Sequence, residues 1–260
     1  MKPRIGIIGG SGVYNPELFE LDRKVAVETP YGEPSGELLI GKLAGVPVAF
    51  LPRHGEAHQY PPHMVPYHAN LYAMKKLGVD LIISPCAVGS LQEDYHPGEV
   101  VIVDQFIDFT KTRDYTFFDG PDTVHISIPD PFCPEVGQLF IDAAEELGIA
   151  AHGKGTYVCI EGPRFSTKGE SFMFLNFAEI IGMTLVPECQ LARELGMCYV
   201  SLAMITDYDV WKDEAVDLSM VLKTMSENLH KVSQLLDVVL PRIPAERGCG
   251  CADSAEGEVD

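Results

Sequence analysis

The chain has 260 residues, of which 46% are hydrophobic, and it carries a formal net charge of −19. This length suits one large α/β domain with a sizeable core. The negative charge repels phosphodiester backbones and anionic lipids, which excludes nucleic acid and anionic membranes as principal partners. A site for a small anion would therefore need Arg, His and backbone N–H groups that converge within this negative field.

The N-terminal segment lacks the pattern of a targeting sequence. Its apolar run at residues 5–8 is interrupted by Gly6 and ends at Gly9, whereas a membrane span needs about 20 apolar residues. We therefore expect a cytoplasmic protein without a membrane span. In such a protein, the seven cysteines act mainly as buried hydrophobic residues rather than as a disulfide framework.

Short apolar runs alternate with amphipathic segments along the chain. This alternation predicts a single α/β domain with a twisted, largely parallel central β-sheet flanked by helices. We place this single domain at residues 1–243, and a Cys-Gly-Cys segment with an unstructured acidic tail at 244–260. The predicted strands cover residues 4–8, 46–51, 81–84, 100–103, 157–160 and 199–205, and the predicted helices cover 65–77, 136–147 (capped by Gly148) and 218–239.

Polar or glycine-rich motifs follow these strands, where the ligand site of an α/β sheet is expected. Gly9-Gly10-Ser11-Gly12 could present backbone N–H groups and a hydroxyl to an anion, or could be only a tight strand exit. Its spacing does not fit the G-x-G-x-x-G dinucleotide fingerprint. Arg53-His54 is a candidate oxyanion clamp, with a surface ion pair of Arg53 as the alternative.

Later motifs point to the recognition of a planar base. Phe165 and Ser166 follow the strand at 157–160 and could stack on a ring and form a hydrogen bond, although Phe165 could equally be a core residue. Asp207 and Asp209 follow the strand at 199–205 and suggest a metal site or a carboxylate with a raised pKa. Metal is disfavoured because no further ligand lies at a convincing spacing.

Together these segments resemble the 5′-methylthioadenosine phosphorylase branch of the trimeric purine nucleoside phosphorylase family. The resemblance runs from about residue 4 to residue 243. The segments that carry it are Ile5-Gly-Ile-Ile-Gly-Gly-Ser11-Gly12, Arg53-His54-Gly55, Ala87-x-Gly89-Ser90, Asp104-Gln-Phe-Ile-Asp108, Glu161-Gly-Pro-Arg-Phe-Ser166, Gly182-Met-Thr184 and Thr206-Asp-Tyr-Asp-Val-Trp211.

The resemblance implies phosphorolysis of 5′-methylthioadenosine to adenine and 5-methylthioribose 1-phosphate, with inosine, guanosine, adenosine or a broad purine range as the alternative. It implies no cofactor, since phosphate is a co-substrate. The implied phosphate ligands are Ser11, Arg53, His54, Cys86, Ala87 and Thr184. The implied nucleoside ligands are Phe165, Ser166, Met183, Thr206, Asp207, Asp209, His125 and Leu218.

Some of these positions carry further expectations. Asp207, with Asp209 beside it, would act at N7 and the 6-amino edge of the base, and apolar Leu218 would suit a methylthio group. Cys86 replaces a Thr or Asn of the relatives, and its thiol is a weaker donor. A catalytic Cys86–His54 pair is the alternative reading of that position.

The resemblance also implies self-association, because His125 resembles a residue that closes the 5′ pocket of a neighbouring subunit. A trimer or a dimer of trimers is therefore expected. Cys249 and Cys251 resemble the Cys-Gly-Cys endings of heat-stable relatives and are expected to form a disulfide, with two free thiols as the alternative. A dinucleotide-dependent oxidoreductase and a redox or scaffold protein centred on these cysteines remain rival classes.

Overall fold

A computed structural model describes residues 2–10, 19–121, 123–212, 218–255 and 258–259. Its centre is an 11-stranded sheet whose main path runs β2-β3-β4-β1-β5-β11-β10-β7; β12 branches from β5, β6 pairs with β12, and β9 pairs with β6. The strands of this sheet are β1 Ile5–Gly9, β2 Phe19–Val25, β3 Leu38–Leu43, β4 Val46–Pro52, β5 Leu81–Ser90, β6 Val100–Ile102, β7 Gln105–Phe109, β9 Ala151–His152, β10 Thr156–Ile160, β11 Ile180–Gly182 and β12 Cys198–Asp207. A separate ribbon joins β8 Val124–His125 to β13 Glu258–Val259.

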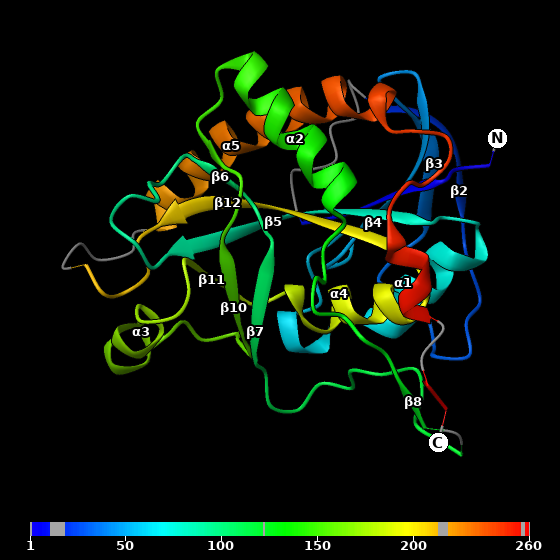
Figure 1. Cartoon of the computed structure of the whole chain (residues 1–260), viewed down its shortest axis with the longest axis horizontal. Helices are drawn as coiled ribbons and strands as arrows, with labels where there is room; N and C mark the ends of the chain where they lie inside the picture. Colours follow the sequence, from blue (N-terminus) through cyan, green and yellow to red (C-terminus); the bar gives the residue numbers. More distant parts are fainter. Residues whose placement is uncertain (1, 11–18, 122, 213–217, 256–257, 260) are drawn as a thin grey trace.

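Helices cover both faces of the sheet. In Figure 1, α2 and α5 lie above the long strands β5 and β12, and α1 and α4 lie below them. The helices are α1 Tyr67–Lys76, α2 Pro134–Leu147, α3 Lys168–Phe174, α4 Leu185–Glu194 and α5 Leu218–Val239, with 3₁₀ turns at η1 Pro62–Met64, η2 Leu240–Arg242 and η3 Gly250–Ala255. Among the described helices, none has the length and apolarity required to cross a membrane.

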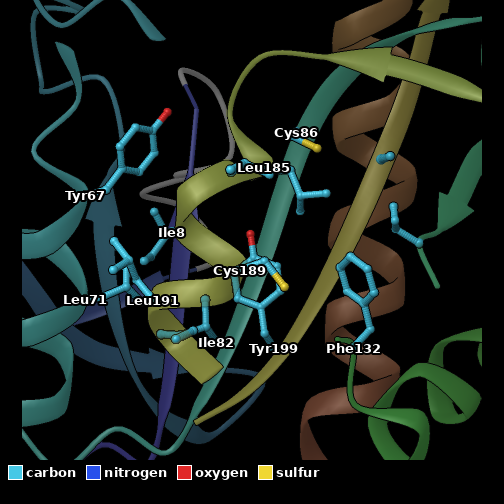
Figure 2. Packing of buried hydrophobic residues seen from close by; sticks show 14 of the residues in the cluster. Ile8, Tyr67, Leu71, Ile82, Cys86, Phe132, Leu185, Cys189, Leu191 and Tyr199 are labelled. Atoms are coloured by element: carbon cyan, nitrogen blue, oxygen red, sulfur yellow. The ribbon is translucent and has the colours of Figure 1, made fainter. Parts of the chain in front are cut away.

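Each face of the sheet has its own hydrophobic core. On the α1/α4 side, side chains of the sheet such as Ile8 and Tyr199 pack against Leu71 and Leu191 (Figure 2). On the other side, residues of α2 and α5, including Phe140 and Leu235, pack over β12 and β1. Burial on both faces explains why the central strands read as continuous apolar runs.

The predicted α/β class and several boundaries are confirmed. The helix expected at 218–239 is α5, and Gly148 ends α2 with a left-handed φ of 64°. The sheet is mixed, however, because β2, β3 and β4 form antiparallel pairs and β11 runs antiparallel to β5. Apolar and polar residues alternate poorly along β2, and its side chains are largely exposed. The sequence pattern therefore did not reveal this strand.

Two further expectations are corrected. The strand expected at 81–84 continues to Ser90, because β12 pairs with it in parallel along its length. The C-terminal residues are not the unstructured tail that their acidic composition suggested: Gly250–Ala255 form η3, and Glu258 pairs with His125 across β13 and β8.

The expected Cys249–Cys251 disulfide is not formed. All seven cysteines lie within the described residues and are free thiols. The sulfur of Cys249 lies 3.4 Å from that of Cys198 and 3.7 Å from that of Cys133, so the fold gives it neighbours that are distant in sequence.

Candidate active site

A cavity of about 350 Å³ lies at the carboxyl ends of the central strands. The arrowheads of β5 and β12 point toward the same edge of the sheet (Figure 1). Parallel strands therefore bring motifs that are distant in sequence together at this edge of the sheet. Residues predicted from sequence that line the cavity are Arg53, His54, Cys86, Ala87, Phe165, Ser166, Met183, Thr184, Thr206, Asp207 and Asp209, together with Gly10 from the first glycine motif.

Arg53 is the buried cation of the cavity. It follows the last residue of β4, is 1% exposed, and forms a two-point ion pair with Glu188 of α4, with Nε–Oε2 at 2.7 Å and Nη2–Oε1 at 2.9 Å. Burial lowers the pKa of Arg53, but the charge and hydrogen bonds of Glu188 outweigh that effect and raise it. The ion pair has no net charge. Arg53 therefore contributes an oriented N–H donor to a bound anion, and its positive charge is largely neutralised by Glu188.

The Glu188 carboxylate also organises its surroundings. Its Oε1 accepts hydrogen bonds from Ser84 Oγ at 2.7 Å and from Tyr199 Oη at 2.9 Å. Nη1 of Arg53 makes a single long contact of 3.3 Å, to the carbonyl of Pro85. Nη1 is therefore the guanidinium nitrogen with spare donor capacity among the contacts of the described residues.

His54 is a neutral imidazole at neutral pH. Burial and the charge of Arg53 lower its pKa to about 4. Its Nδ1 lies 2.8 Å from the carbonyl oxygen of Tyr60, which can only accept, so Nδ1 carries the proton. Nε2 is then an acceptor that suits the hydroxyl group of hydrogen phosphate.

Cys86 lines the cavity without the properties of a nucleophile. Burial raises the pKa of its thiol, and its sulfur lies 3.6 Å from Ser201 Oγ on β12. Since His54 is neutral, it supplies no cation to stabilise a thiolate. These features argue against a catalytic Cys86–His54 pair.

Asp207 ends β12 and is fixed by its neighbours. Its Oδ2 accepts a hydrogen bond from Thr206 Oγ1 and its Oδ1 accepts one from the backbone N–H of Asp209, each at 2.8 Å. Burial raises the pKa of Asp207, although these two hydrogen bonds oppose the rise. Gly89 makes room for this turn, because a Cβ there would lie 3.1 Å from Asp207 Oδ1 and 3.3 Å from the Cβ of Asp209.

Asp209 is a second carboxyl with a raised pKa. Burial is the main cause, and the charge of Asp207 adds to it. Asp209 acts on Asp207 in the opposite direction, because the hydrogen bond from its backbone N–H lowers the pKa of Asp207. Asp209 Oδ2 and the hydroxyls of Ser166 and Ser171 are buried and form no hydrogen bond of good geometry among the described residues, although both hydroxyls lie close enough to Asp209 to oppose the rise in its pKa. Asp209 and Ser166 line the cavity, where a ligand could pair with either of them.

Aromatic and thioether side chains line the rest of the cavity. Phe165 is 67% exposed, which excludes the core role that was its alternative. Met183 lies against Gly162, where a Cβ would come within 2.6 Å of the Met183 sulfur. A flat aromatic ring beside a soft thioether suits a planar, partly apolar ligand.

The structure leaves two predicted residues undescribed at the site and places a third one outside the cavity. Ser11 lies outside the described residues, and the side chain of Leu218, the first residue of α5, is not described. His125 lies in β8 and does not line the cavity. In Figure 1, β8 is close to the C-terminus and distant from the arrowheads of β5 and β12.

Sequence analysis missed three residues of the site. Glu188 is the buried partner of Arg53, and His58 and Met225 line the cavity. Met225 lies within the helix predicted at residues 218–239, and no local pattern distinguishes it from its neighbours. One sequence feature could have indicated Glu188: it is a single acidic residue among the apolar residues that begin α4.

This cavity has the groups needed to hold an oxyanion beside a planar ring. The chain belongs to the phosphorylase superfamily, whose sequence model matches residues 4–241. It is 63% identical over 251 residues to the S-methyl-5′-thioadenosine phosphorylase of Thermococcus kodakarensis, which covers 96% of this chain and 97% of that protein.

Solved structures of methylthioadenosine phosphorylases have a similar fold. A methylthioadenosine phosphorylase from an antarctic soil metagenomic library is similar with a TM-score of 0.91 and 45% identity, over 97% of this chain and 90% of that one. The methylthioadenosine phosphorylase of Schistosoma mansoni in complex with adenine is similar with a TM-score of 0.91 and 38% identity, over 98% and 96% of the two chains.

Proposed function

We propose that this protein catalyses the phosphorolysis of 5′-methylthioadenosine to adenine and 5-methylthioribose 1-phosphate. The observation that carries the proposal is one cavity that holds the Arg53 guanidinium beside the neutral imidazole of His54, and a pair of buried carboxyls, Asp207 and Asp209. The first group suits inorganic phosphate and the second suits the edge of a purine. The names of the relatives support the same reaction.

Phosphate is the proposed nucleophile. Arg53 Nη1 would donate to one of its oxygens, while His54 Nε2 would accept from its hydroxyl group. Thr184, Cys86 and the backbone at Ala87 line the same cavity and are further proposed ligands. Phosphate held under C1′ stabilises the oxocarbenium character that develops as the N9–C1′ bond stretches, and its attack then inverts C1′.

Asp207 is the proposed partner of the leaving base. As the purine departs it gains negative charge, and a protonated Asp207 can donate to N7. The raised pKa of Asp207 supports this role, because it increases the protonated fraction. The buried carboxylate of Asp209 lines the cavity and is a suitable acceptor for a 6-amino group, which favours adenine over a 6-oxopurine.

The proposed reaction uses no resident metal or nucleotide cofactor. Both substrates are small and diffusible, and neither nucleic acid nor a membrane takes part. We place the protein in the cytoplasm, a location supported by seven cysteines that are free thiols.

The proposal includes a trimer or a dimer of trimers in which His125 closes the 5′ pocket of a neighbour. The position of His125 outside its own chain's cavity supports this arrangement. Exposed apolar side chains near α3, including Phe172 and Phe177, offer surface for such contacts.

Product analysis tests the reaction. The purified protein is incubated with methylthioadenosine, adenosine or inosine, each with and without phosphate. We expect phosphate-dependent release of adenine from methylthioadenosine at the highest kcat/KM. Base release without phosphate would contradict phosphorolysis, and a higher kcat/KM for inosine would assign the protein to the 6-oxopurine alternative.

A further inference from the structure

Strand β12 has an irregularity just before the carboxyl pair of the cavity. In its parallel pairing with β5, Ile205 lies opposite Val88. The next paired residue is Asp207, which lies opposite Gly89, so Thr206 is an extra residue in β12. A bulge of this kind redirects the side chains that follow it. Without the extra residue, Asp207 would lie one position further along β5 and would not face Gly89, whose lack of a side chain leaves room for the carboxylate.

The backbone of Ile205 is held by groups outside β5. Its N–H donates to the carbonyl of Glu99 at 3.0 Å, and its carbonyl accepts from the N–H of Gly98 at 2.9 Å. The same carbonyl accepts a second hydrogen bond from Nδ2 of Asn228, also at 2.9 Å. Because the peptide group is planar, fixing this carbonyl also fixes the N–H of Thr206 and the direction in which the bulge begins.

Asn228 is an unusual residue for its place in α5. It is completely buried, and its side-chain carbonyl oxygen has no hydrogen-bond partner among the described residues. Asn is a poor helix former, and a buried amide with an unmet acceptor opposes folding. An apolar side chain of the same size would therefore suit the stability of α5 better. The contact with Ile205 gives this amide a geometric role instead.

One turn further along α5, Lys231 reaches the loop that flanks the bulge. Its Nζ donates to the carbonyl of Gly98, whose own N–H is bonded to the carbonyl of Ile205. One turn before Asn228, Met225 lines the cavity. These three residues of α5 are spaced by three and share one face of the helix, and α5 lies over β12 (Figure 1). That face therefore extends from the cavity to the loop that holds the end of the strand.

We propose that Asn228 and Lys231 form a clamp that positions Asp207 for its contact with N7 of the leaving base. Asn228 is the main element, because it holds the bulge directly, and Lys231 supports it through Gly98. The inference rests on the proposed function of Asp207. Neither clamp residue lines the cavity, so both act as positioning residues rather than as ligands. Loss of the clamp should therefore impair the base end of the cavity and spare the phosphate end at Arg53.

Kinetics of Asn228→Leu test the clamp, since Leu keeps the packing volume but cannot donate to Ile205. We expect kcat for methylthioadenosine to fall about 10- to 100-fold, while KM for phosphate stays within about twofold of its original value. Val232→Ala is the matched control. Val232 is also buried and lies one turn along α5, so its truncation should lower the melting temperature but retain kcat.

Ligand binding gives a readout that needs no turnover. Adenine accepts a hydrogen bond at N7, whereas 7-deazaadenine carries a C–H group there and cannot accept one. Calorimetry of the unmodified protein should show a preference for adenine of about tenfold, the value of one hydrogen bond in a buried site. In Asn228→Leu this preference should shrink toward one, while Val232→Ala should keep it.

Three results with Asn228→Leu would overturn the clamp. They are full kcat, an equal loss of kcat and of phosphate affinity, and an unchanged preference for adenine over 7-deazaadenine. If Asn228→Leu fails to fold, Lys231→Met decides the question, because Lys231 is only half-buried. A kcat loss of about 2- to 10-fold with unchanged KM for phosphate would support the clamp, and full kcat would contradict it.

Failure of the proposed function gives a different result. If the unmodified protein does not cleave methylthioadenosine with phosphate, the proposed reaction is wrong, and the binding comparison still tests the clamp. If the unmodified protein cleaves methylthioadenosine but does not prefer adenine over 7-deazaadenine, both the N7 contact of Asp207 and the clamp are contradicted, while phosphorolysis stands.

Discussion

Asp207 is the residue whose substitution most directly separates base recognition from general catalysis. Asp207→Asn should lower kcat/KM for methylthioadenosine far more than for inosine. With the amide oxygen held by the N–H of Asp209, the amide nitrogen faces the base; it can donate to N7 and to a 6-oxo group, but it opposes the N–H donors of a 6-amino group. Leaving one polar partner unpaired in a buried site costs about 1–3 kcal/mol, roughly 5- to 150-fold. Steady-state kinetics with both nucleosides measure the ratio.

Asp209→Asn is the control for this substitution. It should reduce activity with adenine nucleosides while the N–H of residue 209 continues to support Asp207. An equal loss with both nucleosides for Asp207→Asn would show that Asp207 does not select the base.

The pH profile gives a second test of Asp207. Its pKa is raised by burial, and the donating form is the protonated one, so kcat/KM for methylthioadenosine should fall as pH rises through that pKa. Asn donates at every pH, so the profile of Asp207→Asn should lack this decline. An unchanged profile in the variant would assign the decline to another group.

His54 should make stability depend on pH in the acidic range. Its pKa is about 4 in the folded protein against 6.5 for the free side chain, so the unfolded chain binds more protons between these values. The free energy of unfolding should therefore decrease as pH falls from 6.5 to 4. His54→Asn keeps a donor for the Tyr60 carbonyl and should show a shallower decrease in thermal melts; parallel curves would argue against a neutral buried His54.

At the scale of elements, the ion pair between β4 and α4 holds the phosphate end of the cavity. Glu188→Ala leaves Arg53 buried and unpaired, which should destabilise the fold by about 3–5 kcal/mol and raise KM for phosphate more than KM for the nucleoside. Chemical denaturation and initial rates measure the two effects. Glu146→Ala, which removes the exposed pair with Arg242, should change both very little; a similar effect of the two variants would contradict a special role for Glu188.

At the scale of the whole molecule, the proposed assembly depends on β8. His125→Ala should raise KM for methylthioadenosine more than KM for phosphate, because His125 is proposed to reach only the 5′ pocket of a neighbour. His230→Ala, on the exposed face of α5, is the matched control. Sedimentation should show a trimer or hexamer, and a fully active monomer would contradict the arrangement.

The sequence alone determined the α/β class, helix α5 and most of the residues that line the cavity. It could do so because buried strands are continuous apolar runs, and because ligand sites of α/β sheets follow strand ends. Arg53, Phe165 and Asp207 were each recognisable from the motif that surrounds them.

Only the tertiary structure decided which residues meet from distant parts of the chain. Glu188 is 135 residues from Arg53 in sequence, and no local pattern links them. Likewise, the Cys-Gly-Cys spacing suggested a local disulfide, whereas folding places Cys133 and Cys198 beside Cys249. The physical reason is the same in both cases: a periodic pattern reports which side of an element is buried, but the identity of a buried group's partner depends on how the elements pack.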